Sequence, residues 1–318
     1  MNTLPCGQQL HGKVSLLKHV MRRKLLLAIS LFLVSMVNAP AQNKPVAEVF
    51  CGAELNYADV NFTRLYNVLV NLTPGTKVNL GKDWEFAAQA FIPIINSGYD
   101  SRYKMVRLNM VNLSKVLRFK EARQYLRVTA GLFGKERYGG DVRWMFPINS
   151  WLMVQARLGL TNHWALGFDF EGESESEFGT SDWSFTGMLG VNFWLNSWNT
   201  ELRLMGGRYL NKDYGVEAEG LRHFKHCSVS IFAQVHEKAP NLYVKKKNWF
   251  SGGFRIVMML PPYKKQQKKV VLRPASNFRL TYNAQSDGYS MRKYTTDPEE
   301  NERTYPIRIP WGTGNFDE

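Results

Sequence analysis

Hydrophobic and polar residues alternate along most of the chain after residue 61. Each alternating segment runs for about ten residues, and clusters such as "NSGYD", "YGGD" and "NKDYG" separate the segments. Side chains of a β-strand point in turn to the two faces of a sheet, so a period of two indicates strands, and the clusters indicate turns. The pattern predicts an all-β fold of about 12–14 antiparallel strands, with twelve as the expected number.

The two faces of these strands differ in composition, as residues 201–204 illustrate. Leu202 and Leu204 fall on one face, and Glu201 and Arg203 fall on the other. A soluble β-sandwich would bury the leucines, whereas a transmembrane β-barrel turns them to lipid and encloses the charges. The kind of charge on the polar face helps to decide between the two arrangements.

Every basic residue on the polar face is arginine, while lysines gather in turn regions such as Lys245–Lys247. Enclosed ion networks favour the guanidinium group, because it is planar, weakly hydrated and forms several hydrogen bonds at once. This segregation favours a closed antiparallel barrel with an arginine-lined lumen. The expected lining residues are Arg107, Arg127, Arg143, Arg157, Arg203, Arg255 and Arg279, with the acidic residues Glu85, Asp141, Asp169, Glu171 and Glu201 among them.

Aromatic residues favour the same arrangement. Phe, Trp and Tyr make up 13% of the chain, and many of them occur at expected strand ends. Membrane barrels carry girdles of aromatic side chains at the two membrane interfaces. The residues expected in these girdles are Trp84, Trp151, Trp183, Trp194, Trp198, Tyr209 and Trp249.

The N-terminal region has the three parts of a secretory signal peptide. Arg22–Lys24 are charged, Leu25–Val37 are apolar, and Ala39–Ala41 form a small-residue cleavage site. The apolar run is shorter than the ~20 residues of a spanning helix, so it predicts export, and we expect translation to start at Met21. The expected organisation is a signal peptide at 1–41, a lead-in at 42–60, an outer-membrane barrel at 61–283 and a periplasmic tail or plug at 284–318.

Charge and cysteine content limit the partners. Loss of residues 1–41 lowers the formal net charge from +14 to +9, because this segment holds five basic residues and no acidic ones. An exported chain without a single basic stripe is a poor partner for nucleic acid. The expected partners are outer-membrane lipid, lipopolysaccharide, polysaccharide and other exopolysaccharide-export proteins. Lys245–Lys247 form either a solvated loop or a contact with lipopolysaccharide phosphates, and Cys51 and Cys227 either pair or stay free.

Candidate catalytic and metal-binding groups are sparse. His223, His226 and Cys227 lie close together in sequence, but a strand turns the two histidines to opposite faces, and no second cluster supplies ligands. The chain has no G-x-S-x-G nucleophile motif and no glycine-rich phosphate loop. We therefore expect no catalytic residue, no metal and no cofactor.

A charged network is expected in the hairpin of residues 201–224. Gly206–Gly207 would permit a bulge that turns Arg208 to the charged face. Asp213 suits the turn, and Arg222 would return to meet Glu201 or Asp213. The network either contributes to function or only holds the hairpin in register. Its expected members are Glu201, Arg203, Arg208, Asp213 and Arg222.

The stretch "GGRYLNKDYGVEAEGLRHF" resembles the signature of the YjbH family, outer-membrane β-barrel proteins associated with exopolysaccharide and capsule production. "SVSIFAQ", "SGGFRIVMMLP" and "LRPASNFRLTY" are similar to later segments of that family, so the resemblance covers residues 200–282. It implies a barrel with a transport role. Family members often have two barrels and this chain has room for one, and the lysine-rich "YVKKKNWFSGG" replaces an acidic loop. The matching residues are Gly207, Arg208, Tyr209, Leu210, Asp213, Gly215, Arg222 and Phe224.

These observations lead to three hypotheses of different classes. The first is a non-enzymatic outer-membrane barrel that moves or organises exopolysaccharide along a lumen lined by Arg, Asn, Gln and Ser. The second is an outer-membrane enzyme that modifies lipopolysaccharide or polysaccharide, for which Ser228 and His223 are the residues to test. The third is a soluble periplasmic β-sandwich that binds sugar.

Overall fold

The computed structural model describes residues 46–59, 67–97, 105–119, 122–134, 136–163, 183–210, 212–224, 227–237, 248–259, 269–275, 277–285 and 293–298. The expected signal peptide at 1–41, the lysines at 245–247, His226, and the acidic residues Asp169 and Glu171 lie outside the described residues.

The described chain is all-β, as the alternation predicts, with sixteen strands and one 3-10 turn, η3 (Asn196–Trp198). No helix among the described residues is long and apolar enough to cross a membrane. The strands are β1 (Ala47–Cys51), β2 (Ala53–Asp59), β3 (Asn67–Leu72), β4 (Gly75–Gly81), β5 (Trp84–Ser97), β6 (Arg107–Phe119), β7 (Gln124–Phe133), β8 (Arg137–Pro147), β9 (Leu152–His163), β10 (Ser184–Leu195), β11 (Thr200–Arg208), β12 (Tyr214–His223), β13 (Cys227–Glu237), β14 (Asn248–Met259), β15 (Val270–Pro274) and β16 (Asn277–Gln285).

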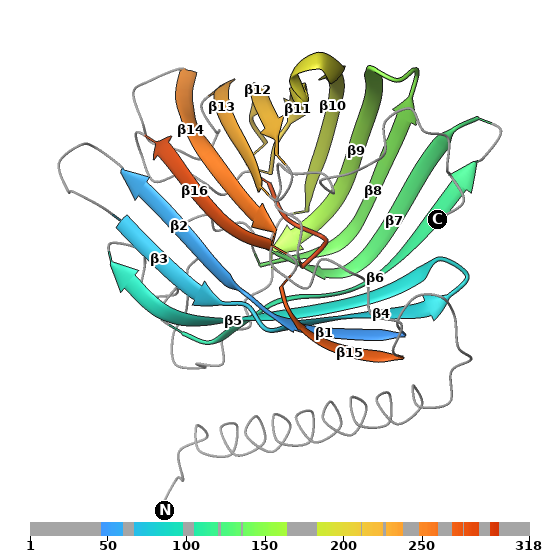
Figure 1. The fold of residues 1–318 in the computed structure, drawn as a ribbon, viewed down its shortest axis with the longest axis vertical. Coiled ribbons are helices and arrows are strands. Elements are labelled where there is room, and N and C mark those ends of the chain that lie inside the picture. The colour runs from blue at the N-terminus through green and yellow to red at the C-terminus, as the bar shows by residue number, and fades with distance from the viewer. Residues whose placement is uncertain are drawn as a thin grey trace, which may run out of the picture.

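All sixteen strands belong to one large, mostly antiparallel sheet (Figure 1). Its order is β15-β1-β4-β5-β3-β2-β16-β14-β13-β12-β11-β10-β9-β8-β7-β6, and β5 pairs additionally with β6. From β5 to β14 each strand pairs antiparallel with the next, which is the arrangement expected from the short turn clusters. The two parallel pairs are β1 with β15 and β2 with β16. The sheet therefore brings the first and last strands of the chain side by side.

The described structure has sixteen strands where twelve were expected, because several extended segments are each interrupted and count as two strands. Only Gly52 separates β1 from β2, and only Thr73–Pro74 separate β3 from β4. The pairing of β1 with β4 continues the pairing of β2 with β3. A Cβ atom at Gly52 would lie 2.5 Å from the Cβ of Ala275, in the break between β15 and β16. The interruptions thus pack against one another, and the sheet starts at Ala47, before the expected boundary at residue 61.

The charged face of the sheet is buried and the apolar face is exposed. Leu202 and Leu204 are 44% and 47% exposed, whereas Glu201 and Arg203, which alternate with them, are 3% and 6% exposed. The same alternation runs through β10, β12 and β13. This distribution is the reverse of the one in a soluble β-sandwich, where apolar side chains fill the core. For these strands, the expectation that the charged face is the buried one is confirmed.

Candidate functional site

The candidate site is the buried charged face, where carboxylates and guanidinium groups of neighbouring strands meet. One network joins β11, β12 and β14. Arg203 binds Glu201 through two hydrogen bonds, Nε to Oε1 at 2.8 Å and Nη2 to Oε2 at 2.7 Å. Glu219 lies between two arginines, 2.9 Å from Arg255 and 3.6 Å from Arg203. Buried ions need such partners, because an unpaired charge in this environment is strongly destabilising.

Polar side chains extend this network on both sides of Glu201. Asn192 of β10 donates a hydrogen bond to Glu201 at 2.7 Å, and Gln155 of β9 donates to Asn192 at 2.7 Å. His223 Nε2 lies 3.5 Å from Glu201 Oε2, and its Nδ1 lies 3.1 Å from the Ser228 hydroxyl. The network thus runs across six strands, from β9 to β14.

A row of arginines forms the second network. Arg127, Arg143 and Arg157 are direct cross-strand neighbours on β7, β8 and β9. Like charges in this position repel one another, so a carboxylate is required nearby. Asp141 provides it through a 2.7 Å ion pair with Arg157, and is itself 2% exposed.

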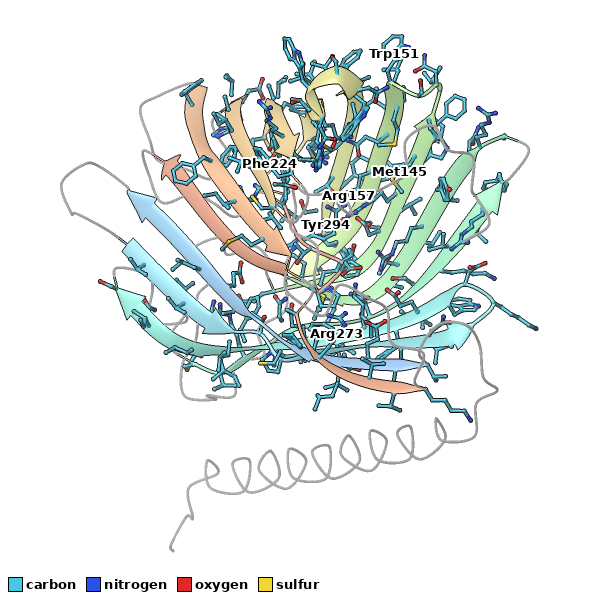
Figure 2. The ribbon with its side chains drawn as sticks, in the orientation of Figure 1. Met145, Trp151, Arg157, Phe224, Arg273 and Tyr294 are labelled. Carbon is cyan, nitrogen blue, oxygen red and sulfur yellow. The ribbon has the colours of Figure 1, made fainter. Side chains whose placement is uncertain are left out.

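Tyr294 connects this row to the C-terminal segment. Its hydroxyl donates a 2.7 Å hydrogen bond to Asp141, and its ring lies 5.4 Å from Phe133 and 4.3 Å from the guanidinium of Arg157. Arg157 also donates to the Tyr294 carbonyl at 3.0 Å. Burial raises the pKa of Tyr294, so the hydroxyl remains protonated and available as a donor. Figure 2 shows Tyr294 and Arg157 together on the inner side of the curved sheet.

Residues 293–298 lie across the charged face and contact many strands. Lys293 pairs with Glu217 of β12 at 2.7 Å, and Asp297 pairs with Lys77 of β4 at 2.6 Å and with Arg127 of β7 at 3.4 Å. Backbone oxygens of the segment accept further hydrogen bonds from β5, β6 and Gly134. We call residues 293–298 the inner segment. Its charged side chains form ion pairs with three strands that are far apart in the sheet order, β4, β7 and β12.

Removal of the Tyr294 hydroxyl tests how firmly the inner segment is held. Tyr294→Phe is expected to lower the free energy of unfolding by about 1–3 kcal/mol, because Asp141 loses a buried hydrogen bond while the ring stays against Phe133. Denaturant titration of the folded protein in detergent measures the change. Tyr138→Phe is the control, because no hydrogen bond of the Tyr138 hydroxyl is found in the described structure; equal losses in both variants would contradict the assigned role.

The structure brings together most of the expected lining arginines. Arg143, Arg157, Arg203 and Arg255 are buried on the charged face. Arg127 is partly buried and hydrogen-bonds Glu85, another of the residues expected on the polar face. Arg107 is half-buried, with its guanidinium 5.1 Å from the ring of Phe91. Arg279 lies in β16, whose side chains are outside the described part of the structure. The charged face is therefore an arginine-rich surface already paired with acids.

The expected hairpin network is only partly correct. Arg222 does not meet Glu201 or Asp213: it pairs with Thr200 and lies on the exposed face, with its guanidinium 5.6 Å from the Phe224 ring. β11 has no bulge at Gly206–Gly207, so Arg208 stays on the apolar face, where its cross-strand neighbour is Gly187. Alternation alone therefore separates both arginines from Glu201 and Arg203.

The other residues of the signature have local structural roles. Gly207 has φ +151°, and a Cβ atom there would collide with the carbonyl oxygen of Gly187, so only glycine fits. Tyr209, Leu210 and Asp213 are buried in the turn between β11 and β12, and Leu210 contacts Phe133 and Tyr294. Gly215 belongs to β12 and packs closely beside β13, and Phe224 is exposed.

The expected girdle residues separate into two groups. Trp84, Trp151, Trp183 and Trp198 are exposed at strand ends, as expected, and Figure 2 shows Trp151 at the upper end of the strands. Tyr209 is buried, and Trp194 packs against His223 with ring centroids 5.0 Å apart, so neither belongs to an exposed girdle. The side chain of Trp249 lies outside the described residues.

Several residues of the site were missed in the sequence. Glu217 and Glu219 alternate with Val216 and Ala218, so the period of two could have placed them on the charged face. The inner segment had no such signal: it was expected only as part of a periplasmic tail or plug at 284–318, and its Asp297 carboxylate binds Lys77 and Arg127. No repeat connects this segment with the strands it contacts.

Metal chemistry and cysteine pairing gain no support from the described residues. Within them, no group of three or more His, Cys, Asp or Glu side chains is placed to hold a metal ion. Cys51 and Cys227 are free. No family model and no curated protein matches this chain.

Proposed function

We propose that this chain is an outer-membrane β-barrel with a segment bound inside it, and that it organises or exports polysaccharide at the bacterial cell surface without catalysing a reaction. The observation that carries the proposal is the distribution of side chains: isoleucine, leucine and phenylalanine on the exposed face, and paired arginines on the buried face. Water disfavours large exposed apolar surfaces, and lipid favours them.

Pairing and strand length support a closed, membrane-spanning sheet. The pairing of β5 with β6 links the strand at one end of the sheet order to an earlier strand, as closure requires. The strands from β5 to β14 have 9–14 residues, and a membrane-crossing β-strand needs about 9–11. Exposed aromatic residues at the strand ends, including Trp151, Trp198 and Tyr214, match interfacial girdles.

Membrane location can be tested by fractionation and heat modifiability. The mature protein is expected to sediment with outer membranes and to migrate faster on a gel when it is not heated, because a closed barrel stays folded in the detergent. Protein that stays dissolved without detergent as a β-rich monomer would support the soluble sugar-binding β-sandwich instead.

A polysaccharide is the proposed cargo because the buried face offers many hydrogen-bonding groups of the kind that bind sugars. Ser230 and His236 are buried on β13, and Asn192 and Gln155 lie on β10 and β9. The resemblance of residues 207–224 to the YjbH signature supports the same cargo. The inner segment occupies this face, so passage of a sugar chain requires the segment to move.

A disulfide between the inner segment and the sheet tests this requirement. Gly134 and Thr295 are joined by a 2.9 Å backbone hydrogen bond, and a Cβ atom at Gly134 would lie 3.4 Å from the Thr295 Cβ, which is close to disulfide geometry. With Cys51 and Cys227 replaced by serine, Gly134→Cys with Thr295→Cys is expected to stop surface polysaccharide production when oxidised. Reductant should restore it.

Surface polysaccharide is measured by staining of whole cells, and each single cysteine variant serves as a control. Production that continues with the disulfide formed would contradict movement of the inner segment. Production that also stops in the single variants would indicate a folding defect, which heat modifiability would reveal.

Catalysis is the second candidate, because the structure brings together three groups that the sequence left apart. Ser228 hydrogen-bonds His223, and the other ring nitrogen of His223 lies 3.5 Å from Glu201, which is the order of groups that serine hydrolases use. Two observations weigh against it: Glu201 is already bound by Arg203, and Ser228 is 1% exposed.

Replacement of Ser228 and His223 decides between the two functions. Ser228→Ala and His223→Ala are expected to leave the chemical composition of lipopolysaccharide and surface polysaccharide unchanged, which mass spectrometry of the purified polymers can show. An altered acyl or sugar composition in both variants, with heat modifiability retained, would establish the enzyme instead.

A further inference from the structure

The exposed apolar face is not uniform, because it has a groove along β12. The groove has a volume of about 840 Å³, within the range of about 300–1,000 Å³ typical of small-ligand sites. Ala218 and Gly220 form its floor, with Leu202 and Leu204 of β11 on one side and Ile231 of β13 on the other. Its lining therefore suits a hydrocarbon chain.

One end of this groove carries a positive charge. Arg222 lies there beside Phe224, and its cross-strand neighbours are Thr200 and Val229. Within the described part of the chain, its guanidinium has no carboxylate partner. The arginines of the opposite face are paired with acids, so Arg222 differs from them in both position and environment.

An exposed arginine on an apolar face requires a counter-charge or water. Placed at the middle of a bilayer it would cost about 2–4 kcal/mol, and near the interface the cost falls to about 0–1 kcal/mol. Arg222 is the penultimate residue of β12, close to the turn between β10 and β11 that contains η3. It would lie at headgroup depth, where phosphate groups accept bidentate hydrogen bonds from guanidinium.

Connection lengths indicate which side of the membrane this end faces. Between β6 and β14, the connections at the Arg222 end are residues 120–123, 148–151, 196–199 and 224–226. The opposite end has the intervals 134–136, 164–183, 209–213 and 238–247, and the second and fourth of these are the longest between β6 and β14. Outer-membrane barrels place short turns in the periplasm and long loops outside. Arg222 would therefore face the periplasmic leaflet, which contains glycerophospholipid and not lipopolysaccharide.

We propose that the groove binds one anionic glycerophospholipid of the periplasmic leaflet. The headgroup phosphate pairs with Arg222, and one acyl chain lies over Ala218 and Gly220, between Leu202 and Ile231. This inference rests on the proposed membrane location, and it gives Arg222 of the resembled signature a role outside the barrel.

Native mass spectrometry of the full-length mature protein in mild detergent, with added phosphatidylglycerol, tests the inference. Arg222→Gln is expected to weaken binding of the first lipid roughly tenfold or more, because a charge-assisted hydrogen bond is lost, and Arg222→Lys should retain part of it. Gly220→Leu is expected to abolish binding by filling the groove. Gly140→Leu adds the same side chain to an exposed glycine with free space around it and should bind as the unmodified protein does.

Equal binding by the unmodified protein, Arg222→Gln and Gly220→Leu would overturn the inference. Tighter binding of lipid A than of phosphatidylglycerol would overturn it as well, because the groove would then face the leaflet that contains lipopolysaccharide. Heat modifiability of each variant separates this inference from the proposed function. If the protein inserts into membranes but binds lipid independently of Arg222, only the proposed lipid site is contradicted. If the protein does not insert, both the lipid site and the proposed function are contradicted.

Discussion

Asp141→Asn is expected to lower the free energy of unfolding by about 3–5 kcal/mol, because it leaves buried arginines without a counter-charge. Asp141 forms the 2.7 Å ion pair with Arg157 and accepts the hydrogen bond of Tyr294. Arg143 and Arg157 are direct cross-strand neighbours, so their repulsion is no longer offset when the carboxylate becomes an amide. Denaturant titration in detergent or lipid vesicles measures the loss.

Asp83→Asn is the matched control for this measurement. Its carboxylate lies 3.7 Å from Arg118 and its side chain is 49% exposed, so the same substitution should cost less than about 1 kcal/mol. Asparagine also tolerates the positive φ of 64° at this turn position. Similar small losses for Asp141→Asn and Asp83→Asn would mean that water reaches the charged face, and the enclosed network would have to be abandoned.

Leu189→Arg is expected to destabilise the membrane-inserted protein by about 2–4 kcal/mol, because the guanidinium would enter the hydrocarbon near the middle of β10. Leu189 is 62% exposed. In a soluble protein, a charge at such an exposed position changes stability by less than about 0.5 kcal/mol. The two environments thus predict different results for one substitution, and folding titrations into lipid vesicles distinguish them.

Tyr214→Arg provides the comparison at the end of a strand. Tyr214 is 55% exposed on the same face, at the first residue of β12, where the cost of arginine falls to about 0–1 kcal/mol. A depth-dependent difference between the two variants supports a lipid-facing surface. If Leu189→Arg were as mild as Tyr214→Arg, the exposed face would be in contact with water.

The sequence was most informative where a strand alternates without interruption. In β11 and β13 the period of two assigns each side chain to a face, and the choice of arginine over lysine indicated that the charged face is the buried one. Glu201 and Arg203 were assigned in this way and meet as expected. A repeating pattern needs no knowledge of distant contacts, so local reasoning suffices.

Local reasoning failed where the position of a residue depends on register or on a distant segment. Arg208 was assigned to the charged face by assuming a bulge that is absent from β11, and a shift of one residue reverses the face of a side chain. Arg222 was expected to return to Glu201 or Asp213, but its cross-strand neighbour is Thr200, on the exposed face. Residues 293–298 have no periodic pattern, and their contacts with Glu217 and Asp141 join residues far apart in sequence.

The most direct test of the orientation is the solvent around a spin label on β10. A nitroxide attached to Leu189→Cys, with Cys51 and Cys227 replaced by serine and the protein in lipid vesicles, reports collisions with dissolved oxygen and with a water-soluble nickel chelate. We expect oxygen to dominate at residue 189, as it does in hydrocarbon, whereas collisions dominated by the nickel chelate would show that this face lies in water and would contradict the account.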